Sequence, residues 1–324
     1  MKRYTLADEG QASFDMEATP YTKAADPTKY FGLLTEDIDF TGGQNPLTPR
    51  STGGTRRAPF CHSVETKEYA FSIPILPIDA NVPLEIAMGE RNITDILDGE
   101  SVKVGERHRF TEADILPTAT IQHDQKDLDL SEWFIGTKAS VSFEAAIGDP
   151  VQITLDCLAA RHEYDDEVTE FPDLEIPTAK CTFEFLMHEG ILYDGEPFLA
   201  VAGITHGIDN GLEALFHGGQ KREAYAIGET TNADKYDTTI TAKILDLKQY
   251  LAAVENEARV DIVLPFVRGK SADETINDAI ILTLKDCKIM SANIPFQAEG
   301  NLEHEIELAP LDTIIDIMVP EPEP

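Results

Sequence analysis

Residues 108–161 decide the fold of this chain, and they read HRFTEADILPTATIQHDQKDLDLSEWFIGTKASVSFEAAIGDPVQITLDCLAAR. Apolar and polar residues alternate on both sides of the turn sequence Gly148-Asp149-Pro150. The apolar positions are Val141, Phe143, Ala145, Val151, Ile153, Leu155 and Cys157. The polar positions between them are Ser142, Glu144, Gln152, Thr154 and Asp156. Two segments in which apolar and polar residues alternate, joined by a turn, predict a β-hairpin with one buried side and one solvent-facing side.

The remaining chain repeats this alternation and predicts a mainly β protein. Further alternating runs begin at Tyr69, Ile240, Val260, Ile280 and Met290. Such one-sided strands are typical of sandwiches and barrels. One short helix is expected in each half, because residues 83–89 begin with Pro and end with Gly, while residues 246–254 carry an apolar stripe after a capping Asp246.

Four segments follow from these patterns. Residues 1–58 are rich in turn formers, show no periodic run and are expected to form an extended arm that lies along another surface. Residues 59–172 and 173–318 are expected to form two β-domains, and residues 319–324 an extended tail. Because strand then helix occurs in both halves, we interpret the two domains as a duplication in tandem.

Composition restricts the possible partners. The chain has 59 acidic and 26 basic residues, a net charge of −33, and 42% hydrophobic residues, which predicts a folded protein with an acidic surface. Binding to a phosphate backbone needs clustered Lys and Arg, so DNA is expected to be repelled. Because salt at about 1 M shortens the Debye length to about 3 Å, this acidity favours a saline, halophilic host.

Targeting and cysteine signals point to the cytoplasm. Two basic residues near Met1 precede no apolar core, and no run approaches the length of about 18 apolar residues that spans a membrane, so neither export nor a membrane partner is expected. The four cysteines, Cys61, Cys157, Cys181 and Cys287, are dispersed, which favours reduced structural thiols over a disulfide or a zinc pair.

Chemical motifs are weak. Residues 162–167 combine a His with four carboxylates, but they lack the alternating oxygens and Gly of a calcium loop and are better interpreted as a solvated loop. The histidines show no zinc spacing, the glycines form no phosphate cradle and no nucleophile elbow occurs. We therefore expect no enzyme activity, no cofactor and no resident metal.

Two features allow an interaction role. Arg56-Arg57 is a basic cluster in an acidic chain, either a solvated pair or an inter-subunit contact to a carboxylate of a neighbouring copy. Trp133, the single Trp, is either a core residue or an interface anchor.

The amino-acid sequence of several segments resembles that of the tail tube proteins, or major tail proteins, of long-tailed viruses. Residues 116–121 read LPTATI, residues 134–143 read FIGTKASVSF and residues 148–156 read GDPVQITLD. The resemblance continues, by segment order, through residues 29–41, 68–89 and 183–216.

This resemblance implies copies that form rings around a channel, with strands of neighbouring subunits joined into an inner β-barrel and rings stacked into a tube that delivers the genome. With the acidity it suggests a halophilic archaeal virus. The length and duplication suggest a trimeric ring with pseudo-sixfold symmetry rather than a hexamer. Tape-measure, tail terminator and distal tail proteins are implied partners, and DNA passes without specific binding.

The polar sides of the strands are the expected lumen wall, because acidic walls shorten the residence of a polyanion. The predicted lumen-facing residues are Glu144, Gln152, Thr154, Asp156 and Thr241. The main alternative is a capsid-surface or other virion β-sandwich protein, and a second alternative is a halophilic cytoplasmic enzyme.

Overall fold

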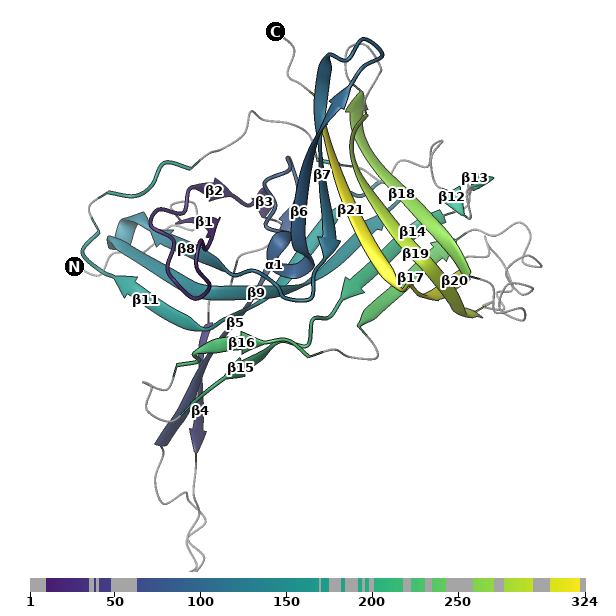
Figure 1. The fold of residues 1–324 in the computed structure, drawn as a ribbon. Helices are drawn as coiled ribbons and strands as arrows, with labels where there is room; N and C mark the ends of the chain where they lie inside the picture. Colours follow the sequence, from purple (N-terminus) through teal and green to yellow (C-terminus); the bar gives the residue numbers. More distant parts are fainter. Residues whose placement is uncertain are drawn as a thin grey trace, which may run out of the picture.

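The computed structural model describes residues 10–34, 38, 41–47, 63–168, 170–174, 182–183, 192–193, 196–197, 201–217, 223–230, 235–242, 259–270, 277–293 and 304–320. The structure is 66% strand, and nearly all strands belong to one large antiparallel sheet (Figure 1). Helical structure is limited to α1 (Glu85–Met88) and the 3-10 turn η2 (Lys126–Leu128) among these residues. The mainly β prediction is therefore confirmed. The sheet does not close into a barrel within the described ranges.

Seven strands form a first band of the sheet, and they come from both halves of the chain. Across the band they are β4 (Thr41–Leu47), β5 (Ser63–Leu76), β10 (Gln152–Ala159), β9 (Leu130–Ala146), β14 (Val201–Ile208), β17 (Tyr236–Ala242) and β20 (His304–Ala309). The pairing of β9 with β14 joins the two predicted halves directly.

A second band meets the first where β20 runs into β21 (Asp312–Pro320), because the long strand β19 (Asn277–Asn293) pairs with both. On one side lie β18 (Arg259–Lys270), β12 (Leu192–Tyr193) and β13 (Glu196–Pro197). On the other side β21 pairs with β7 (Lys103–Glu112), and β7 with β6 (Gly89–Leu97). The sheet therefore forks at β20 and β21.

The first half of β9 holds a smaller group of strands. These are β8 (Ala119–Gln125), β11 (Arg161–Asp165), β1 (Gly10–Met16) and β2 (Lys29–Tyr30), while β3 (Leu33–Leu34) pairs with the end of β5. A separate ribbon consists of β15 (Glu213–Leu215) and β16 (Ala226–Gly228). β9 changes partners near Gly136, whose φ of +69° favours glycine.

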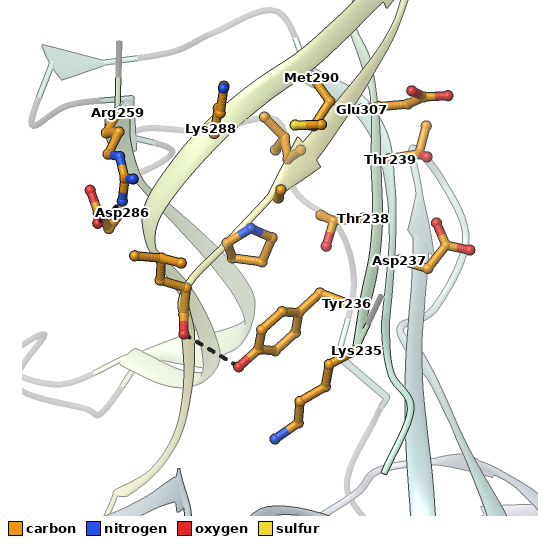
Figure 2. Close-up of a pocket in the computed structure, with 14 residues that line it drawn as sticks. Lys235, Tyr236, Asp237, Thr238, Thr239, Arg259, Asp286, Lys288, Met290 and Glu307 are labelled. Carbon is orange, nitrogen blue, oxygen red and sulfur yellow. Dashed lines mark hydrogen bonds and ion pairs between the residues drawn. The ribbon is translucent and has the colours of Figure 1, made fainter. Parts of the chain in front are cut away.

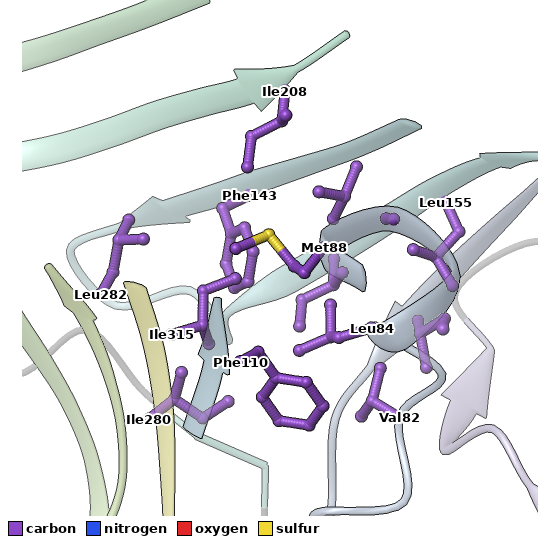
Figure 3. Close-up of a cluster of buried hydrophobic side chains, with 14 of the residues drawn as sticks. Val82, Leu84, Met88, Phe110, Phe143, Leu155, Ile208, Ile280, Leu282 and Ile315 are labelled. Carbon is purple, nitrogen blue, oxygen red and sulfur yellow. The ribbon is translucent and has the colours of Figure 1, made fainter. Parts of the chain in front are cut away.

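Apolar side chains from both bands meet around α1, which fills the fork. Figure 3 shows Leu84 and Met88 among Phe110, Phe143 and Ile315, all of them buried. Burial of each such side chain contributes about 1.5–3 kcal/mol relative to exposure. The helix predicted at residues 83–89 is confirmed, and the one predicted at residues 246–254 lies outside the described residues.

The hairpin predicted around Gly148 is confirmed together with its two faces. Ile153 lies opposite Phe143, and Leu155 lies opposite Val141, with all four side chains at most 2% exposed. Gly148 has a φ of +88° at the turn. The alternation therefore fixed the register, because a shift of one residue would have turned the apolar row toward solvent.

The N-terminal segment differs from its expectation, because part of it belongs to the core. β1 pairs with β8 over seven residues, and Phe14 and Phe31 are each only 2% exposed, with ring centroids 4.9 Å apart. The sequence hides this contribution because the short stretches around Phe14 and Phe31 each contain a single buried aromatic residue, which leaves no period to detect.

The same segment covers Trp133. Lys23 Nζ lies 3.1 Å from the centroid of the indole ring, and Trp133 Nε1 donates a hydrogen bond to Gln122 Oε1 at 2.9 Å. The tryptophan thus packs within the chain, half-buried between its own strand and the N-terminal segment.

Candidate functional site

The polar side of the central hairpin is the start of the candidate site. Gln152 lies opposite Glu144, Thr154 opposite Ser142, and Asp156 opposite Ser140. Ser72 of the adjacent strand β5 donates its hydroxyl to Asp156 Oδ1 at 2.5 Å. The row of polar side chains therefore continues without a break from β9 over β10 to β5.

The row also continues in the other direction. Thr205 of β14 lies opposite Glu144, Thr239 of β17 lies opposite Thr205, and Glu307 of β20 lies opposite Thr239. Thr241 lies on the same side, opposite Gly203. We call this surface the acidic face. Its exposed carboxylates include Glu144, Asp156, Asp237, Glu305 and Glu307.

The structure thus brings the five predicted lumen residues onto one surface of one sheet. Glu144 and Asp156 are exposed, and the other three are half-buried between their neighbours. Arg56 and Arg57 lie outside the described residues. Five carboxylates on a shallow polar wall create a negative potential, which disfavours a polyanion and requires no specific contact with it.

A cleft opens beside the bend from β20 to β21, next to the acidic face (Figure 2). Its volume is about 700 Å³, and its walls include Lys235, Arg259 and Lys288. Tyr236 also lines the cleft and donates its hydroxyl to Glu112 Oε1 at 2.5 Å, while Lys235 forms an ion pair with the same carboxylate. Burial and Glu112 raise the pKa of Tyr236, so this phenol stays protonated.

Nucleophilic chemistry finds no support in the described cysteines. Cys157 and Cys287 are free and buried, as predicted, and burial raises the pKa of Cys157 well above its usual value and that of Cys287 to about 12. Thiols in this state are poor nucleophiles and metal ligands. Cys61 and Cys181 lie outside the described residues.

Residues 162–165 belong to strand β11 (Arg161–Asp165) and pair with β9, so the solvated loop expected for residues 162–167 is wrong over most of its length. His162 Nε2 lies 3.1 Å from Glu132 Oε1, and His123 Nδ1 lies 3.4 Å from Glu132 Oε2. Hydrogen bonds from these two imidazoles lower the pKa of Glu132 to about 2. Within the described ranges, no group of three His, Cys, Asp or Glu residues is arranged to hold a metal.

A buried histidine that the sequence did not single out lies in the fork of the sheet. His206 of β14 is 0% exposed. Its Nδ1 lies 2.8 Å from Thr238 Oγ1 of β17, and its Nε2 lies 3.2 Å from Thr313 Oγ1 of β21. The imidazole therefore links both bands through two hydroxyl groups, and burial lowers its pKa to about 4.

Acid is expected to destabilise the protein through His206. An unfolded histidine has a pKa near 6.5, whereas that of His206 is about 4. Between these values the unfolded chain binds a proton that the folded chain excludes, so the free energy of unfolding falls by up to about 3 kcal/mol from pH 6.5 to 4. Urea unfolding of wild type and His206→Gln at pH 7 and 4.5 measures this. Equal losses of stability in both proteins would contradict the assignment.

Two arginines on the second band share one carboxylate. Arg107 Nε and Nη2 donate to Asp316 at 2.9 and 2.5 Å, and Arg109 Nε and Nη2 donate to it at 2.8 and 3.0 Å. The Asp316 side chain is 3% exposed, and those of Arg107 and Arg109 are 36% and 40% exposed. Sequence reasoning missed this cluster. The i, i+2 spacing of the arginines was visible, but nothing local indicates a partner about 200 residues away.

No protein family model matches the sequence, and no curated protein is significantly similar to it. Among the residues that the structure describes, no helix is both long and apolar enough to cross a membrane.

Proposed function

We propose that this chain is a structural virion protein, the subunit of a viral tail tube, whose copies form stacked rings around a channel for genome delivery. The observation that carries the proposal is the acidic face. It extends over six neighbouring strands, β5, β10, β9, β14, β17 and β20, and an apolar core lies directly behind it. A channel for DNA benefits from a continuous wall that repels phosphate. In the cleft beside this wall, Lys235 and Arg259 are neutralised by ion pairs with Glu112 and Asp286.

The edges of the sheet support assembly. Within the described residues, β4 pairs only with β5, and β6 pairs only with β7. The free edge of β6 carries Ile93 and Leu97, which are 52% and 55% exposed. Edge strands of this kind pair readily with another chain, and closure into a barrel between subunits removes them.

The hairpin of β4 and β5 projects well away from the body and is suited to reach a neighbouring ring (Figure 1). Arg56 and Arg57 lie between these two strands in the sequence, in the part outside the described residues. We retain them as the proposed inter-subunit contact. Stacked rings make open, heterologous contacts, the kind that generates filaments.

The proposal also includes the domain organisation, the ring symmetry, the tail partners and the host. Residues 59–172 and 173–318 act as tandem tail-tube domains, and a trimeric ring with pseudo-sixfold symmetry is favoured over a hexamer. Tape-measure, tail terminator and distal tail proteins complete the tail, which assembles in the cytoplasm of a halophilic host and becomes part of an archaeal virus particle. The chain has no catalytic role in this proposal.

Purified protein in concentrated salt is expected to form rings or hollow tubes visible by negative-stain electron microscopy. Salt at about 1 M screens the repulsion between copies of net charge −33. It leaves intact the contacts that form where strand edges of neighbouring copies pair and become buried. A protein that stays monomeric at every concentration and salt would exclude the tube. Closed shells would favour a capsid protein instead.

The position of the acidic face in such tubes is tested by labelling. Thr154→Cys, in a chain with Cys61 and Cys181 changed to Ser, is expected to react with a small maleimide in both monomers and tubes. A bulky polyethylene glycol maleimide should label only the monomers, because the channel excludes it. Equal labelling of tubes by both reagents would place this face on the outside.

A further inference from the structure

The second band has an outer surface of a different character from the acidic face. Arg107, Arg109 and Asp316 lie on the side opposite the core, since the adjacent residues Phe110 and Ile315 are fully buried. Three half-buried apolar residues lie on the same side. We call this surface the arginine face, and it consists of Arg107, Arg109, Asp316, Ile281, Ile314 and Met318.

The cluster carries one net positive charge, because two guanidinium groups share a single carboxylate. This is a small positive cluster in a chain of net charge −33, and exposed Glu90 of β6 lies on the same side of the sheet. Each hydrogen-bonded guanidinium uses Nε and Nη2 with Asp316, which leaves Nη1 able to donate to a further acceptor. Asp316 therefore holds both arginines in fixed orientations, and fixed donors lose little conformational entropy when they bind a second carboxylate.

The surroundings favour a protein over a nucleic acid as the occupant. Half-buried apolar residues around arginine have the composition of the centre of a protein interface. A nucleic acid would gain few phosphate contacts here, because only two arginines of this face could reach its backbone.

We propose that the arginine face docks a carboxylate-bearing surface of a second copy of this chain. Each copy offers many carboxylates and one such face, so charge complementarity is available within the assembly itself. The contact is heterologous and can repeat from copy to copy. This inference rests on the proposed self-assembly and names one of its contacts.

A neutral triple variant, Arg107→Gln with Arg109→Gln and Asp316→Asn, tests the proposal and leaves no unpaired buried charge. The matched control is Arg259→Gln with Asp286→Asn, which removes an exposed ion pair of 2.6 Å elsewhere on the second band. Sedimentation velocity at the lowest salt concentration at which wild type associates is expected to show an association constant reduced at least about tenfold for the triple variant and unchanged for the control.

Mixing provides an independent readout. The triple variant keeps its own carboxylates and can still dock onto the arginine face of wild type, but it cannot accept the next copy. A substoichiometric amount is therefore expected to shorten wild-type assemblies. A misfolded protein would not have this effect, and circular dichroism checks the fold directly.

Each outcome of these experiments supports or overturns the docking inference or the tail tube proposal. If the triple variant assembles like wild type, the docking inference is overturned and the tail tube proposal stands. If wild type is monomeric under all conditions, both are overturned. If wild type forms only small oligomers that the triple variant loses, the inference stands and the tube fails. DNA binding by wild type that the variant loses, with association unchanged, would assign the face to nucleic acid.

Should the triple variant not fold, hydrogen exchange on the wild-type protein replaces it. Assembly is expected to increase amide protection in β7 and β21. Unchanged protection of both strands in the assembled protein would overturn the inference.

Discussion

Ile153→Asp is expected to unfold the protein. Ile153 is 0% exposed and lies between Phe143 of β9 and Ile75 of β5. The substitution removes an apolar side chain from a packed site, which costs about 2–5 kcal/mol, and adds the cost of burying an unpaired carboxylate. The sum approaches the total stability of a typical domain, about 5–15 kcal/mol. Loss of the β signal in circular dichroism, or recovery only as insoluble protein, measures the effect.

The control is Glu144→Lys combined with Asp156→Lys in the same hairpin. Both residues are exposed on the acidic face, so folding is expected to change by less than about 1 kcal/mol. The same variant makes this part of the face basic, so assembled tubes should retain DNA that wild-type tubes release. If the double variant unfolds while Ile153→Asp stays folded, the assignment of faces and the channel model are both wrong.

Removal of the N-terminal strand is expected to have the second largest effect. Deletion of residues 1–16 removes β1 from β8 and leaves Phe31 without the ring of Phe14. Phe14→Ala alone is expected to cost about 3–5 kcal/mol through the cavity it creates. Urea denaturation of the point variant measures this cost, and the deletion is expected to yield unfolded or aggregated protein.

Ser13→Ala is the matched control for this strand. Ser13 is buried next to Phe14, and its hydroxyl has no hydrogen-bond partner within the described part of the chain. Its removal is expected to leave stability unchanged or to raise it slightly, because no bond is lost. A soluble deletion protein with wild-type stability would restore the view of this segment as a detachable arm.

Much of the local structure was predictable from the sequence. The alternation around Gly148 predicted both strands, their register and the two faces, and the Pro and Gly around residues 83–89 predicted α1. The alternation within each strand also placed the five predicted lumen residues on the solvent-facing side. These features depend on neighbours in the chain and on the periods of two and 3.6 residues, which a sequence displays directly.

The partners of the strands were not predictable in this way. β7 pairs with β21 across more than half of the chain, β9 passes from one set of strands to another at Gly136, and β1 completes a sheet that it does not adjoin in sequence. An alternating strand shows which side is apolar and not which strand it will pair with, because every strand edge offers the same backbone donors and acceptors.

The sequence by itself thus determined a mainly β protein, an acidic surface and the two sides of its hairpin. Only the tertiary structure decided that one forked sheet joins both halves, that His206 links the bands, and that Asp316 fixes Arg107 and Arg109. The reason is physical. Side-chain alternation is a local property, whereas hydrogen bonds and ion pairs between distant segments exist only after the chain has chosen how its strand edges pair.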